Sequence, residues 1–119
     1  MKALAVFFVF TTIFIVCGKV SFAQDPVKVA PEKVKMLLEN DKVRVLEFAV
    51  KPGEETGMHS HPNHVIYFLA DGKMMTTMSD GTSSEMEVKA GDTHWSEPVT
   101  HNNKNVGKTD AHAIVVELK

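Results

Sequence analysis

The sequence predicts an all-β fold, either an antiparallel sandwich or a barrel, that forms one domain over residues 24–119. Turn-forming residues recur about every 8 to 12 positions, and the runs between them are too short for helices. Neither an internal repeat nor a linker divides the chain. The turn signals lie at Asn40-Asp41, 51–57, Asp71-Gly72, Asp80-Gly81, 90–92 and 102–110.

The predicted strands lie between these turns. The first is expected at 34–38, where apolar residues alternate with lysines, although 31–38 would also fit a short helix. The two Asp-Gly pairs predict two-residue hairpin turns, because both central positions of such turns favour positive φ. The later strands are predicted at 43–50, 65–70, 73–78, 82–88, 93–96 and 113–118.

Residues 1–23 are predicted to be a cleaved secretory signal peptide. Lys2 precedes an apolar run over 3–17, and small residues follow up to Ala23, in the order that such peptides show. As a helix the run would reach only about 22 Å, short of the roughly 30 Å hydrocarbon core, which argues against a stable membrane anchor. Lipidation of Cys17 is the less favoured alternative, because bulky residues precede it. We therefore expect a secreted protein of the bacterial periplasm.

Composition excludes several classes of protein. With 44% hydrophobic and 24% charged residues the chain has the balance of a globular domain rather than of a disordered one. Its formal net charge is −2 and it contains no basic block, so nucleic acid is not an expected partner. The single cysteine falls in the predicted signal peptide, which excludes thiolate ligands and a cysteine nucleophile from the domain.

The histidines are the residues that point to chemistry. Three of the six lie within six positions, and His59 and His61 are two residues apart. Because residues i and i+2 of a strand face the same side, these two imidazoles can present nitrogen to one metal ion. The alternative is a pair of surface histidines, but a tight turn leads into the pair and Pro62 follows it.

The surrounding residues resemble the cupin superfamily. Its first motif is Gly, five residues, His-x-His, three or four residues, Glu, six residues and Gly, and this chain matches it at Gly53, His59, His61 and Gly72. Counting back from Gly72, the glutamate position holds Val65.

The second cupin motif is matched at Gly91, Pro98, His101 and Asn105, without its internal glycine and with one residue fewer between the proline and the histidine. The resemblance extends over about 43–118. It is to small single-domain bacterial cupins, the type-2 conserved barrel.

This resemblance implies a double-stranded β-helix, or jelly-roll barrel, with one divalent transition metal in its mouth. His59, His61 and His101 would be the ligands. The ion would be Fe, Mn, Ni, Zn or Cu, of which Zn, Cu, Fe and Ni suit neutral imidazole. Some cupins have lost the ion, and there the histidines only line a polar pocket. Because cupins commonly pair through their sheets, a homodimer is also expected.

The missing glutamate would change the chemistry of the ion. Three neutral imidazoles leave its double positive charge intact, which favours a small anionic organic molecule in the open position. His64 is the nearest replacement ligand. Regular alternation turns it away from His59 and His61, but a bulge at Pro62 could turn it back; otherwise His64 is interpreted as a group at the pocket rim.

The other aromatic and histidine side chains are weaker candidates. His94 and Tyr67 are considered as pocket residues and, with His64, as proton-transfer groups, while an exposed or core position is the alternative for His94. His112 alternates with three apolar residues at 114, 116 and 118, which predicts the polar end of a core-facing strand rather than a ligand.

Three functions fit these observations. The first is a metal-dependent enzyme of the dioxygenase or isomerase type that acts on the small anion, and the second is a binding protein that captures a metal or a metabolite without turnover. In the third, the metal only stabilises a small barrel that has no disulfide. Sequence alone leaves the three open.

Overall fold

The computed structural model describes residues 24–119, so the predicted signal peptide lies outside the described residues. Within this range no helix is long and apolar enough to cross a bilayer. The elements are α1 (Pro26–Val29), β1 (Val34–Glu39), β2 (Val43–Val50), β3 (His59–His61), β4 (His64–Phe68), β5 (Gly72–Met78), β6 (Ser83–Val88), β7 (Thr93–Ser96), β8 (Val99–Asn105) and β9 (Ala111–Leu118).

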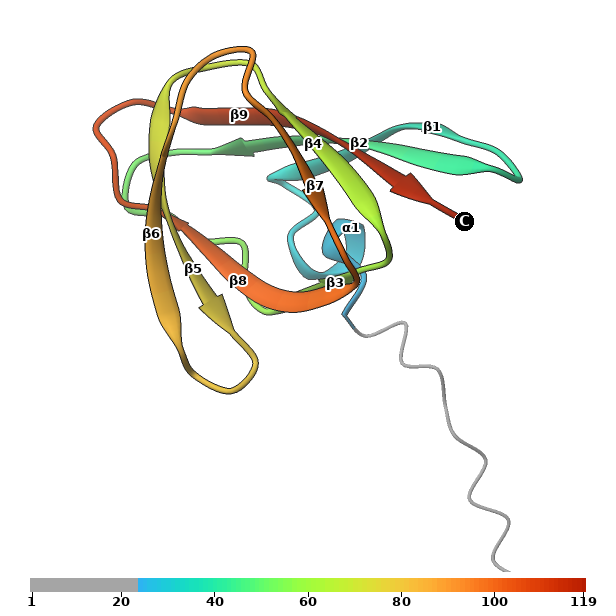
Figure 1. Cartoon of the computed structure of the whole chain (residues 1–119), viewed down its shortest axis with the longest axis horizontal. Coiled ribbons are helices and arrows are strands. Elements are labelled where there is room, and N and C mark those ends of the chain that lie inside the picture. The colour runs from blue at the N-terminus through green and yellow to red at the C-terminus, as the bar shows by residue number, and fades with distance from the viewer. Residues whose placement is uncertain (1–23) are drawn as a thin grey trace, which may run out of the picture.

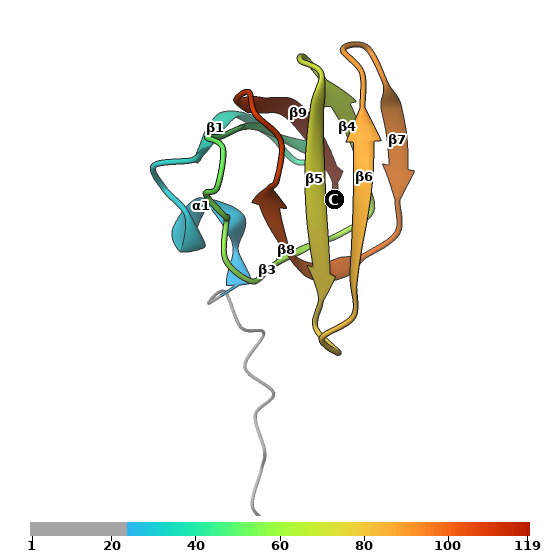
Figure 2. The same cartoon turned by 90° about the vertical axis from the view of Figure 1, so that its left-hand side faces the viewer.

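The strands form two antiparallel sheets that face each other (Figure 1). One has five strands in the order β1-β2-β9-β4-β7, and the other has four in the order β3-β8-β5-β6. Figure 2 shows β5 and β6 from outside, with α1 at the opposite side of the barrel beside β3. The predicted all-β, antiparallel architecture is confirmed.

Most strands lie close to their predicted bounds, including the polar β6 predicted at 82–88, whereas the polar β8 does not. Residues 43–50 and 93–96 coincide with β2 and β7. The prediction that 102–110 is a turn is wrong for its first part, because Asn102–Asn105 belong to β8. Two asparagines of β8 form hydrogen bonds to other strands. Thr76 Oγ1 donates to Asn103 Oδ1 at 2.8 Å, and Asn105 Nδ2 donates to the carbonyl of Val50 at 2.8 Å.

The two Asp-Gly pairs do not form the predicted two-residue hairpins. Asp71-Gly72 leads from β4 in one sheet to β5 in the other. Asp80-Gly81 does connect the β5–β6 hairpin, but only Gly81 has positive φ, because no residue other than glycine does so in the described part of the chain. Glycine alone thus supplies the left-handed backbone of that hairpin.

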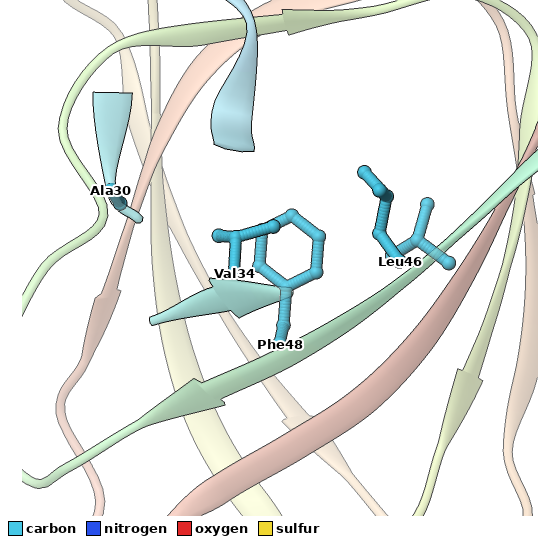
Figure 3. Close-up of a cluster of buried hydrophobic side chains, with 5 residues drawn as sticks. Ala30, Val34, Leu46 and Phe48 are labelled. Carbon is cyan, nitrogen blue, oxygen red and sulfur yellow. The ribbon is translucent and has the colours of Figure 1, made fainter. Parts of the chain in front are cut away.

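The apolar core lies against the five-stranded sheet (Figure 3). Ala30, Val34, Leu46, Phe48 and Val115 form one buried cluster. The helix α1, which is not among the predicted elements, begins at Pro26 with Asp25 as its N-cap. Ala30, which directly follows α1, belongs to the buried cluster, so the chain after the helix covers one end of the core. The helix itself lies beside β3.

Candidate metal centre

Three histidines converge on one point from two neighbouring strands. His59 and His61 lie on one face of β3, and His101 of β8 pairs directly opposite His59. One ring nitrogen from each lies within 4.8 Å of the others. His59 is 0% and His61 6% exposed. The alternation of β3 and its register with β8 are thus sufficient to assemble a set of three imidazoles.

The hydrogen bonds of His59 leave one nitrogen free for a metal. Its Nδ1 lies 2.8 Å from the carbonyl oxygen of Gly57, and because a carbonyl only accepts, Nδ1 carries the hydrogen. Nε2 therefore carries the lone pair. It is buried and has no hydrogen-bond partner among residues 24–119. A buried polar atom without a partner is costly, and a metal ligand is the role that this nitrogen fits.

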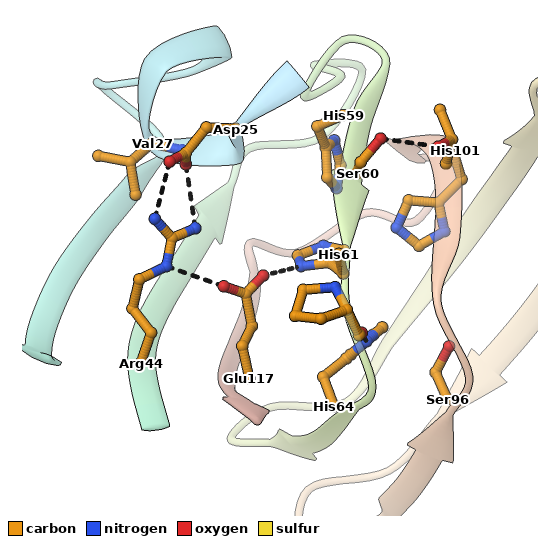
Figure 4. Close-up of polar contacts among 12 residues, drawn as sticks. Asp25, Val27, Arg44, His59, Ser60, His61, His64, Ser96, His101 and Glu117 are labelled. Atoms are coloured by element: carbon orange, nitrogen blue, oxygen red, sulfur yellow. Dashed lines mark hydrogen bonds and ion pairs between the residues drawn. The ribbon is translucent and has the colours of Figure 1, made fainter. Parts of the chain in front are cut away.

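His61 is held in the same way, but by a carboxylate. Its Nδ1 lies 2.5 Å from Oε2 of Glu117, which is 3% exposed and lies at the end of β9. Arg44 Nε donates to the other oxygen, Oε1, at 2.8 Å. Figure 4 shows Glu117 between Arg44 and His61. His61 thus also keeps Nε2 available on the side away from Glu117.

Burial keeps two of the imidazoles neutral. It lowers the pKa of His59 to about 4, with His61 and His64 adding to the effect. Burial and the neighbouring imidazoles of His59, His61 and His64 lower the pKa of His101 to about 3. Since metal ligands must be deprotonated, these two residues are ready to coordinate at neutral pH without losing a proton.

Replacing Gly57 with alanine is expected to lower the free energy of unfolding by more than the roughly 1–2 kcal/mol that a left-handed backbone alone costs. Gly57 has φ +83°, and an added Cβ would lie 3.1 Å from Cγ1 of Val29. Gly81→Ala is the matched control, because Gly81 has φ +88° with open space around its Cβ position. Urea denaturation should show the larger loss for Gly57→Ala, and an equal loss would mean that the Val29 contact is unimportant.

His64 is buried next to the cluster rather than placed at the rim. It is 2% exposed, and its ring centroid lies 4.5 Å from that of His61. At Pro62 the chain passes from the four-stranded to the five-stranded sheet, and the burial of the ring contradicts a position at the rim. Nδ1 of His64 lies 2.7 Å from the carbonyl of Pro62. Burial lowers the pKa of His64 as well.

A cavity of about 140 Å³ adjoins the histidines between the two sheets. His61, His64 and His101 line one part of it, and Thr56, Thr76 and Asn103 add further polar groups. No lysine, arginine, aspartate or glutamate of the described residues lines it. His112 also lines it, and most of the remaining wall is apolar and includes Phe48, Val50, Ile66, Met74, Val88 and Val115.

The comparison with protein families decides the identity of the fold. A model of the cupin domain matches residues 46–117. The chain belongs to the cupin family. No curated protein matches the sequence.

Solved cupin structures agree with this assignment. A cupin domain from Bordetella pertussis superposes with a TM-score of 0.67 and 27% identity, covering 72% of this cupin and 91% of that chain. An RmlC-like cupin with a double-stranded β-helix from Methanocaldococcus jannaschii gives 0.59 and 17%, covering 71% and 77%. A predicted oxalate decarboxylase from Thermotoga maritima gives 0.52 and 23%, covering 72% and 79%. The double-stranded β-helix is thereby confirmed.

Two of the predicted pocket residues of this cupin do not line the cavity. On β4 the side chains of Ile66 and Phe68 face inward, so strand alternation turns Tyr67 outward, where it is 46% exposed. His94 is half-buried on β7, and its ring packs against Phe68 at 5.4 Å. Proton transfer by Tyr67 inside the cavity is therefore excluded by its position.

Glu117 is the residue that sequence reasoning missed. The apolar residues at 114, 116 and 118 predict the core face of the last strand, together with His112, but that prediction is wrong. The buried positions of β9 are Ala113, Val115 and Glu117, and His112 pairs instead with Glu47 at 3.2 Å. Both faces of this strand are apolar enough to be buried, so alternation alone could not identify the inner one.

Proposed function

We propose that this cupin binds one divalent transition metal through His59, His61 and His101 and captures a small organic anion beside it. The observation that carries the proposal is the unpartnered, buried Nε2 of His59 in a cluster of converging imidazoles next to a cavity. The candidate ions are Fe, Mn, Ni, Zn and Cu, of which Fe, Ni, Zn and Cu suit imidazole ligands best.

The metal would supply positive charge and an open coordination position. Three imidazoles contribute no negative charge, and no carboxylate among residues 24–119 lines the cavity. The position that holds glutamate in the cupin motif is occupied by Val65, and the neighbouring Ile66 lines the cavity. Since no lysine or arginine among residues 24–119 lines the cavity either, a bound anion would find its counter-charge at the metal.

The cavity limits the size and character of the ligand. At about 140 Å³ it is close to a cavity of roughly 150 Å³ that admits benzene, so a ligand of about six non-hydrogen atoms fits. Apolar side chains form most of the wall. A short aliphatic acid matches this wall, with its carboxylate toward the histidines and its hydrocarbon part toward Met74 and Val88.

His64 would orient the ligand from the side. Its Nδ1 is directed to the carbonyl of Pro62, which leaves Nε2 as a hydrogen-bond acceptor for a donor group on the ligand. His64 would thus select acids that carry a hydroxyl or amino group near the carboxylate.

A purely stabilising metal is less well supported. All three histidines come from β3 and β8, which are already hydrogen-bonded neighbours with His59 opposite His101. An ion held there would not tie the two sheets together. The presence of a cavity beside the cluster favours ligand binding instead.

Butyrate is expected to bind the metal-loaded protein at least about tenfold more tightly than the metal-free protein, because the ion supplies a charge-assisted contact. Calorimetric titration of both forms tests this, with butyramide as a neutral ligand of the same size and oxalate as a compact dianion. Equal affinity of butyrate for both forms, or of butyrate and butyramide for the loaded form, would contradict the proposal.

Export and self-association stay predictions. Secretion to the periplasm depends on the pattern in residues 1–23, and a homodimer depends on the resemblance to other small cupins.

A further inference from the structure

Four side chains form a continuous series of hydrogen bonds from the start of α1 to the cluster of three histidines. Asp25 accepts two hydrogen bonds from Arg44, from Nη1 at 2.7 Å and Nη2 at 3.0 Å. Arg44 Nε donates to Glu117 at 2.8 Å, and Glu117 accepts from Nδ1 of His61. Figure 4 shows the four in this order.

We infer that Glu117 is a positioning residue for the metal site, and that Arg44 and Asp25 act on the site through Glu117. The inference rests on the proposed function. By accepting the hydrogen of Nδ1, Glu117 fixes both the tautomer and the orientation of the His61 ring, so that Nε2 presents its lone pair to the ion. A carboxylate in this position also makes the imidazole a stronger ligand.

Glu117 itself is not a ligand in this arrangement. Its two oxygens are occupied, Oε2 by His61 and Oε1 by Arg44. The negative charge of Glu117 therefore lies on the side of His61 opposite the metal position. It acts there although no carboxylate among residues 24–119 lines the cavity. The ion would be held more firmly without losing the open position that an anion needs.

Arg44 is needed because the carboxylate is buried. A charged group at 3% exposure is stable only when it is paired and hydrogen-bonded. The guanidinium is planar and reaches Glu117 and Asp25 at once, which lysine cannot do. Asp25 in turn fixes the far side of the guanidinium, and the same carboxylate caps α1 by accepting from the backbone of Val27 at 3.0 Å.

The segment before β1 is thus part of the metal site. A second contact supports this, because Oγ of Ser60, the residue between His59 and His61, donates to Oε1 of Gln24 at 2.8 Å. Asp25 and Arg44 both precede residues 46–117, which match the cupin domain. The family match alone would not have assigned them to the site.

Zinc affinity, measured by competition with a chromophoric chelator, tests the inference in a set of variants. Glu117→Gln is expected to bind zinc about 10–100-fold more weakly, because an amide cannot accept from both His61 and Arg44. Arg44→Met should weaken binding about tenfold. Asp25→Asn should weaken it less, and this variant keeps the helix cap, since asparagine caps as well as aspartate.

The matched control is Glu47→Gln. Glu47 lies on the same strand as Arg44 and also pairs with a histidine, His112, at 3.2 Å, but this pair lies outside the cluster of three histidines. The Glu47→Gln protein should therefore bind zinc like the wild type. Circular dichroism establishes that each variant is folded before titration. If Glu117→Gln binds within about twofold of the wild type, or if Glu47→Gln is weakened equally, the inference is overturned while the proposed function stands.

A measurement on the metal-free protein separates the inference from the proposed function. Nitrogen-15 NMR of the histidine side chains should show His61 with its hydrogen on Nδ1 in the wild type, and a loss of this preference in Glu117→Leu and Arg44→Met. If the wild-type protein binds neither zinc nor any other of the candidate ions, the proposed function fails, whereas the tautomer of His61 still tests whether Glu117 orients the ring. A wild-type His61 with its hydrogen on Nε2 would overturn that role.

Discussion

Replacing His101 with alanine is expected to weaken zinc binding by more than about 100-fold, beyond the usual effect of removing a residue that only supports a ligand. His101 is the one histidine of the cluster that lies on β8, and it faces His59 across the strand pair. Two imidazoles on β3 would remain, and two ligands cannot complete a metal site of the usual three or four.

His94→Ala is the control for this experiment. His94 is a half-buried imidazole on β7 that packs on Phe68 and does not line the cavity. Competition with a chelator should give wild-type affinity for His94→Ala. A His101→Ala protein that keeps its zinc affinity would show that the three histidines do not form the site.

Saturating zinc is expected to raise the melting temperature by about 15 °C or more. An ion at 1,000 times its Kd stabilises the folded state by about 4 kcal/mol when it binds that state alone. In a domain of this size each 1 kcal/mol corresponds to roughly 4–8 °C. Thermal denaturation with and without zinc, followed by circular dichroism, measures the shift.

The same measurement on His101→Ala provides the control, because a binding loss of about 100-fold should reduce the zinc-induced shift of that variant to less than about half of the wild-type shift. A shift of equal size in this variant would assign the stabilisation to zinc bound elsewhere. No shift in the wild type would contradict metal binding in the folded state.

The parts of this structure that sequence predicts are those with a repeating physical pattern. The apolar run between two turn signals predicts β2 at its observed bounds, and the turn signals on either side delimit β7. The i, i+2 spacing of His59 and His61 is enough to place both rings on one face of β3. His101 could be predicted only through the spacing of a family motif, because β8 is polar and reads as a turn.

What the sequence could not predict depends on contacts between distant residues. Glu117 meets His61 only after β9 has paired with β2 and β4, and the inner face of β9 is set by that pairing rather than by its own residues. Arg44 lies on β2 directly opposite Glu117, which explains their contact, but neither residue carries a local signal. The position of His64 could not be predicted from strand alternation, because the chain changes sheets at Pro62.

The change of sheet at Pro62 has a consequence for how a ligand meets the site. His61 and His64 are only three residues apart and belong to different sheets, yet their ring centroids lie 4.5 Å apart. The two packed rings therefore close the seam between the sheets at this point. Because both rings line the cavity, a ligand reaches them together and from the same side. The separation of these two contacts is thus set by three residues of backbone, without any closing flap.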